Sequence, residues 1–165
     1  MADLEQRIRR LEDRAALEEL AIRYFRSADD DDFEAMAACF AAEATFTAGS
    51  FGSATGRDAV VEMLRGQREH MVKSVHTFDT MLLEFRSDDE ASGVIGAHLE
   101  IGIGGTTVWA AVRYEDDFVR RDGAWQILRA EMKNIHAGSW ADAATSLVDE
   151  NRVRWPGTDA APSEA

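Results

Sequence analysis

The 165-residue chain carries a net charge of −13 and is 45% hydrophobic, which is typical of one acidic globular domain. The acidic balance argues against binding to nucleic acid or to an anionic membrane, because both need a cationic surface. The single cysteine, Cys39, excludes an internal disulfide. The sequence shows neither a secretory signal nor an apolar run of membrane-spanning length, so we expect a cytoplasmic protein.

The first seventy residues show the apolar spacing of helices. The apolar stripe of the N-terminal segment changes phase near Asp13, where we expect a bend or a new helix start. The run Asp31-Asp32-Phe33-Glu34 has the pattern of a capping box, which opens a helix. The three predicted helices cover residues 4–28, 33–40 and 56–71, and a short strand is predicted at residues 44–48.

From Ser74 onward, strand patterns and tight-turn signals replace the helical spacing. Gly104-Gly105 and Asp122-Gly123 are hairpin signals, and residues 87–90 form a polar turn. Three helices before an antiparallel meander indicate an α+β fold with the helices on one side. We predict one domain at residues 1–155 and a flexible tail at 156–165. The four strands are predicted at residues 75–85, 93–103, 106–120 and 124–135, and a closing helix at 141–153.

The chemistry available to this chain comes from side-chain acids and bases. Its four histidines lack metal-ligand spacing, and no phosphate-binding glycine loop is present, so we expect neither a metal nor a cofactor. The most promising pair is Asp29, beside apolar Phe25 and Ala28, and His76 at the start of a strand. His70 is predicted as a solvated residue. Four aspartates in a row are usually wet surface, so the residues alone leave an inert and a catalytic interpretation open.

The element order resembles a known family. The motifs are Arg14-Ala15-Ala16-Leu17, Val75-His76-Thr77 and Asp122-Gly123-Ala124-Trp125. Together they resemble the SnoaL-like branch of the nuclear-transport-factor-2-like superfamily, and within it the members that include scytalone dehydratase, bile-acid 7α-dehydratase and lindane dehydrochlorinase. This resemblance implies a cone-shaped barrel, in which a curved antiparallel sheet wraps on three N-terminal helices. The fold also hosts isomerases, cyclases, hydrolases and binders, so fold alone does not determine function.

The resemblance implies a catalytic dyad of His76 and Asp29, with Tyr24 matching a tyrosine of the bile-acid enzyme. Histidine is a base near neutral pH, and a carboxylate on its far nitrogen fixes the tautomer. A tyrosine hydroxyl can donate to a leaving group. Acid catalysts that relatives carry on the meander are replaced here by apolar residues, which leaves the general acid open. Substrate-binding positions implied by the resemblance are Phe46, Met71, Leu99, Tyr114, Met132 and Asn134.

We therefore expect a cofactor-independent lyase of the dehydratase type, acting on a hydrophobic cyclic, polyketide-like or steroid-like small molecule. The alternatives are a non-catalytic small-molecule-binding cone and a cyclase or isomerase that uses the same base. His98 and Trp109 are predicted on the outer face of the meander, where an apolar patch would need covering. We thus expect a homo-oligomer, for which the resemblance favours a trimer before a dimer.

Overall fold

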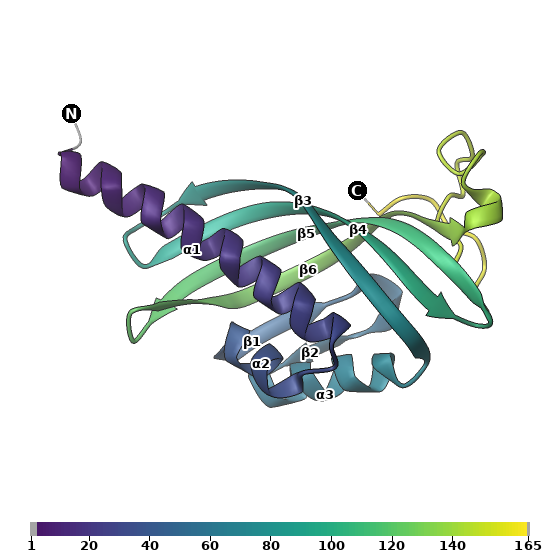
Figure 1. Cartoon of the computed structure of the whole chain (residues 1–165), viewed down its shortest axis with the longest axis horizontal. Coiled ribbons are helices and arrows are strands. Elements are labelled where there is room, and N and C mark those ends of the chain that lie inside the picture. Colours follow the sequence, from purple (N-terminus) through teal and green to yellow (C-terminus); the bar gives the residue numbers. More distant parts are fainter. Residues whose placement is uncertain (1–2, 165) are drawn as a thin grey trace.

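The computed structural model describes residues 3–164 as three helices packed inside a curved, six-stranded sheet (Figure 1). Two short 3-10 helices lie at Gly49–Phe51 and Trp140–Asp142. No helix within residues 3–164 is both long and apolar enough to cross a membrane. The helices are α1 (Leu4–Asp29), α2 (Phe33–Cys39) and α3 (Arg57–Arg68). The strands are β1 (Phe40–Thr47), β2 (Ser53–Thr55), β3 (Met71–Phe85), β4 (Glu90–Ile103), β5 (Thr106–Arg121) and β6 (Ala124–Ser139).

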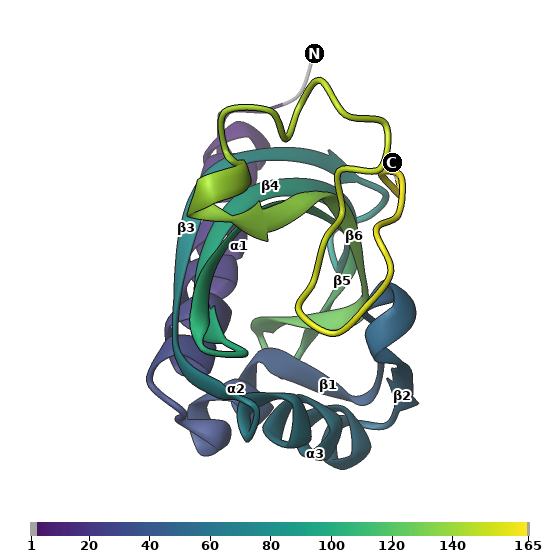
Figure 2. The same cartoon turned by 90° about the vertical axis from the view of Figure 1, so that its right-hand side faces the viewer.

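The sheet has the strand order β2-β1-β6-β5-β4-β3 and bends around the helices (Figure 2). The predicted α+β cone and its four-strand meander are confirmed. One pairing differs from the expected antiparallel sheet, because β1 runs parallel to β6. A parallel neighbour becomes possible because β1 reaches the sheet through the helical layer rather than through a tight hairpin. The sheet is therefore mixed, and it stays open between the edge strands β2 and β3.

The bend or restart predicted near Asp13 is wrong, because α1 is one continuous helix. Asp13 is buried, and its carboxylate accepts a hydrogen bond from the indole N–H of Trp125 at 3.0 Å. It also forms an ion pair with Arg120 of β5. The apolar stripe changes phase because this acid occupies a position on the buried face, where the two donors compensate its desolvation.

The closing helix predicted at residues 141–153 is also wrong. Only one 3-10 turn forms, held by the side chains of Ser139 and Asp142, and irregular turns follow. Leu147 and Val148 remain exposed, so the predicted apolar face has nothing to pack against. The segment predicted as a loose tail returns over β6, where the Ser163 hydroxyl donates to the carbonyl of Ile135.

Two helix boundaries matter for the site. The N-cap of α2 is Asp32, whose carboxylate accepts from the N–H of Ala35 at 3.0 Å. In a capping box, the third residue after the N-cap is Glu or Gln, and its side chain accepts from the N-cap N–H. Here that residue is Ala35, so the second hydrogen bond of the box is missing. Asp31 takes a left-handed conformation with φ of 55°, which turns the chain sharply between α1 and α2. The third helix ends at Arg68 rather than Met71, and Met71 already belongs to β3.

Candidate active site

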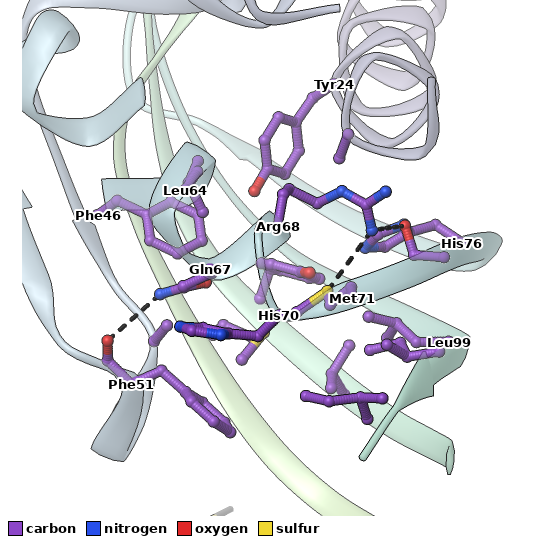
Figure 3. Close-up of a pocket in the computed structure, with 18 of the residues that line it drawn as sticks. Tyr24, Phe46, Phe51, Leu64, Gln67, Arg68, His70, Met71, His76 and Leu99 are labelled. Atoms are coloured by element: carbon purple, nitrogen blue, oxygen red, sulfur yellow. Dashed lines mark hydrogen bonds between the residues drawn. The ribbon is translucent and has the colours of Figure 1, made fainter. Parts of the chain in front are cut away.

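A cavity of about 170 Å³ lies between α3 and the concave face of the sheet (Figure 3). Its walls are mainly apolar. Among the residues predicted to bind substrate, five line it: Phe46, Met71, Leu99, Tyr114 and Met132. Tyr24 and His76 line it too, so α1, β1, α3 and the four meander strands all contribute to one partly open cavity. Such a space suits an apolar ligand held by a few polar groups.

His76 and Asp29 are in direct contact in the wall of this cavity. The ring nitrogen Nδ1 of His76 lies 2.6 Å from Oδ1 of Asp29, and its backbone N–H donates to Oδ2 at 2.8 Å. The hydroxyl of Ser74 donates to Oδ1 at 2.8 Å. Ser74 and His76 are two residues apart on β3, so both side chains face the concave side. Asp29 meets them because it is the last residue of α1.

Three donors hold the Asp29 carboxylate, and this settles the tautomer of His76. Burial acts to raise the pKa of Asp29, but hydrogen bonds from the ring and backbone of His76, its charge and the Ser74 hydroxyl outweigh burial and lower that pKa. An ionised carboxylate only accepts hydrogen bonds, so Nδ1 of His76 carries the proton. The lone pair of the ring is then on Nε2. Phe25 stacks on the imidazole with ring centroids 5.2 Å apart and limits its rotation.

Two tyrosines add hydroxyl groups to the apolar interior. The hydroxyl of Tyr24 points into the cavity (Figure 3). Burial, followed by the nearby acidic groups of Tyr114 and Asp116, raises the pKa of Tyr24 well above its ordinary value. Burial likewise raises the pKa of Tyr114. Both hydroxyls therefore stay protonated and can donate hydrogen bonds. A five-residue separation points Tyr24 and Asp29 in different directions around a helix: Tyr24 lines the cavity, whereas Asp29, the last residue of α1, lies behind His76 and Ser74, which line it.

Asn134 does not line the cavity, although the resemblance implied a substrate-binding role. It is buried, and its backbone N–H and side-chain amide both donate to Oε2 of Glu164, at 2.7 and 2.9 Å. The returning C-terminal segment thus occupies the position from which a ligand could have reached Asn134. Because the sequence indicated a loose tail at residues 156–165, the contact of Glu164 with Asn134 was not expected.

Several lining residues were missed from the sequence. Arg68 and Gln67, at the end of α3, face the cavity (Figure 3). His70 borders the cavity as well and is exposed, as predicted. Trp155 closes one wall, with its ring edge-on to Phe51 at a centroid distance of 5.3 Å. Ser74, which also lines the cavity, could have been found from the sequence, because it lies two residues before His76 and therefore on the same face of the strand. Within residues 3–164, no three His, Cys, Asp or Glu side chains gather into a set that could hold a metal ion.

Comparison with known sequences identifies a family. The SnoaL-like domain matches residues 9–131, which is well over half of the chain. Among curated proteins, no sequence matches this chain significantly.

Several solved structures share the fold. The crystal structure of LinA superposes with a TM-score of 0.78 at 21% identity, covering 81% of this chain and 93% of that one. A candidate scytalone dehydratase from Novosphingobium aromaticivorans gives a TM-score of 0.75 at 20% identity, covering 92% and 97%. The hexachlorocyclohexane dehydrochlorinase LinA-type3 from Novosphingobium barchaimii gives 0.76 at 20% identity, covering 81% and 94%. At these identities, the likeness establishes the fold.

Proposed function

Since the chain belongs to the SnoaL-like domain family, we propose that it is a cofactor-independent lyase that eliminates a small leaving group from an apolar cyclic substrate. The observation that carries this proposal is the contact of His76 Nδ1 with Asp29 at 2.6 Å in the wall of an apolar cavity. That contact leaves Nε2 free to act as a base. The names of its structural neighbours, a dehydrochlorinase and a candidate scytalone dehydratase, support elimination as the reaction class.

In the proposed reaction, Nε2 of His76 takes a proton from a substrate carbon. The electrons of the broken C–H bond form the new double bond, and the leaving group departs from the neighbouring carbon with its bonding electrons. Asp29 stabilises the imidazolium that results, as the carboxylate does in hydrolytic triads. The protonated hydroxyl of Tyr24 donates a hydrogen bond to the departing group, where negative charge accumulates.

The size of the cavity limits the substrate. Its volume of about 170 Å³ is close to that of an engineered protein cavity of about 150 Å³ that binds benzene. We therefore propose a substrate built on a single six-membered ring. A steroid-like molecule, which the sequence left open, has four fused rings and is larger than this volume.

The test is incubation of the wild-type protein and His76→Ala with hexachlorocyclohexane, which has one six-membered ring, and with scytalone, which has two fused rings and probes the size limit, followed by chloride measurement and mass spectrometry. We expect loss of chloride from hexachlorocyclohexane with the wild type and none with His76→Ala. Equal product from both proteins would remove His76 from the mechanism. Binding of a probe without product would favour a non-catalytic cone. An isomerised or cyclised product of unchanged mass would favour an isomerase or cyclase that uses the same base.

A further inference from the structure

A chain of hydrogen bonds leads from the dyad to the end of α3. The Ser74 hydroxyl that contacts Asp29 also lies 3.1 Å from Nη1 of Arg68. On its other side, Arg68 contacts both carboxylate oxygens of Asp31, through Nε at 2.6 Å and Nη2 at 3.2 Å. Ser74 is 1% exposed and the side chain of Arg68 is 9% exposed, so solvent screens the contact between them little, whereas the side chain of Asp31 is 53% exposed.

The direction of every bond in this chain is fixed by chemistry. A guanidinium group has donors and no acceptor, so Ser74 must accept from Arg68. The one hydrogen of the Ser74 hydroxyl is then committed to Asp29. The anion of Asp31 holds the guanidinium in place with two parallel bonds, the geometry that orients an arginine most firmly. Consequently, Asp29 always receives a hydrogen on Oδ1 from Ser74 and another on Oδ2 from the backbone of His76.

We propose that Arg68 and Ser74 are positioning residues that hold the Asp29 carboxylate in the orientation that selects the Nδ1–H tautomer of His76. This inference rests on the proposed function, in which Nε2 of His76 must be free of a proton. Without Ser74, the carboxylate keeps two contacts, both with His76, and loses the one donor that holds it from outside the dyad. Without Arg68, the Ser74 hydroxyl regains a choice of partners, so the effect is smaller.

A second basic residue near the dyad, Lys73, can be compared with Arg68. Lys73 precedes Ser74 on β3, and its side chain contacts the backbone carbonyl of Asp29 and, at 3.7 Å, the carboxylate of Asp30. Its side chain is exposed, and it does not touch the carboxylate of Asp29. Both Arg68 and Lys73 therefore place a positive charge near the end of α1. Of these two residues, Arg68 is the one connected to the Asp29 carboxylate, through the hydroxyl of Ser74.

The experiment compares Ser74→Ala, Arg68→Met and the control Arg65→Met. Arg65 lies one turn earlier on α3, and its side chain is 47% exposed and pairs with Glu62. Because Arg65 does not line the cavity, Arg65→Met removes the same charge from α3 without touching the chain of hydrogen bonds. The readout is the ¹⁵N spectrum of the His76 imidazole in the ligand-free protein at a pH where the ring is neutral. Thermal unfolding checks that each variant is folded.

We expect the wild type and Arg65→Met to show one tautomer, with the proton on Nδ1. Ser74→Ala should show a mixture of tautomers, and Arg68→Met a smaller admixture. With a substrate, kcat should fall by about 10- to 100-fold in Ser74→Ala, the usual effect of misplacing a supported catalytic group, and less in Arg68→Met. Arg65→Met should keep the wild-type kcat.

An unchanged tautomer in both folded variants would overturn the positioning role, whatever the activity. If Ser74→Ala fails to fold, Arg68→Met decides by the same spectrum, because its mixture is expected independently. Absence of turnover by the wild type would contradict the lyase function alone, since the spectrum needs no substrate.

Discussion

Two His–Asp pairs lie on opposite faces of β3, where the inner pair joins β3 to the end of α1 and the outer pair joins β3 to β4. On the concave face His76 contacts Asp29 at 2.6 Å, and on the outer face His98 contacts Asp79 at 2.5 Å. The rungs are adjacent, because His76 pairs with Leu99 and the next residue pairs with His98. By distance alone, the two pairs are indistinguishable.

Their surroundings differ in every other respect. The side chains of His76 and Asp29 are 10% and 16% exposed, against 45% and 34% for His98 and Asp79. The inner carboxylate has three donors and adjoins the cavity, whereas the outer histidine stacks on Trp109 at a ring distance of 5.8 Å. A His–Asp contact is therefore common chemistry, and burial, extra donors and an adjoining cavity distinguish a candidate catalytic pair.

The sharpest way to break this comparison is to remove each histidine in turn. His76→Ala should lower kcat by on the order of 10⁴-fold, because the proposed base is lost. His98→Ala should leave kcat unchanged, since His98 faces away from the cavity. Both are measured by product formation from whichever probe the wild type converts. Equal losses in the two variants would show that the concave and outer pairs do not differ in function.

Replacing the carboxylates should distinguish the two pairs less strongly than replacing the histidines. Asp29→Asn keeps the shape of the side chain but presents an amide that can stabilise the wrong tautomer, so kcat should fall by about 10²- to 10⁴-fold. Asp79→Asn should have no effect on kcat. Steady-state kinetics with KM reported separately is the measurement. A rise in KM at constant kcat for Asp29→Asn would mean that Asp29 serves binding and not the chemical step.

Sequence reasoning reached the fold through local patterns, because strand alternation and glycine turns predicted the meander. The contact between Asp29 and His76, which lie 47 positions apart, was implied only by the family resemblance, which aligned an acid at a helix end with a histidine at a strand start. The predicted cone is confirmed, and the catalytic role of the dyad stays a proposal.

What sequence reasoning missed depends on contacts between distant segments. The phase change at Asp13 looked like a broken helix because its partners, Arg120 and Trp125, are more than 100 positions away. Glu164 reaches Asn134 from a segment without any recognisable pattern. Arg68 looked like an ordinary charged residue at a helix end, since nothing local reveals that its guanidinium turns inward.

The outer face should serve association where the inner face serves chemistry. His98 and Trp140, which is 53% exposed, both stack on Trp109 at this face. We propose that a second copy of the chain covers this surface, in a trimer or else a dimer. Light scattering should give a multiple of 18.3 kDa for the wild type and for His76→Ala, and a smaller mass for Trp140→Lys. A wild-type mass of one chain would contradict self-association.

The smallest effect concerns a carboxyl group that is buried without a histidine. Asp116 is 4% exposed, and within the described residues 3–164 its Oδ1 has no hydrogen-bond partner. Burial raises its pKa well above the ordinary value, and the charge of Arg129 offsets this only in part. Asp29 shows the opposite direction, because its donors lower its pKa. The two acids should therefore influence stability with opposite signs.

For Asp29, the unfolded chain holds its proton to higher pH than the folded one, so its stabilising contribution exists above pH 4 and is lost as pH falls through the lowered folded pKa. For Asp116, the unfolded chain releases its proton near pH 4 while the folded chain keeps it, so stability declines as pH rises toward the raised folded pKa. Asp116→Asn removes this titration. Its Tm relative to the wild type should therefore rise steadily from pH 4 to pH 7. The exposed acid Glu12 is the control, and Glu12→Gln should show no such trend. A difference between Asp116→Asn and the wild type that stays constant with pH would mean that Asp116 is ionised in the folded protein.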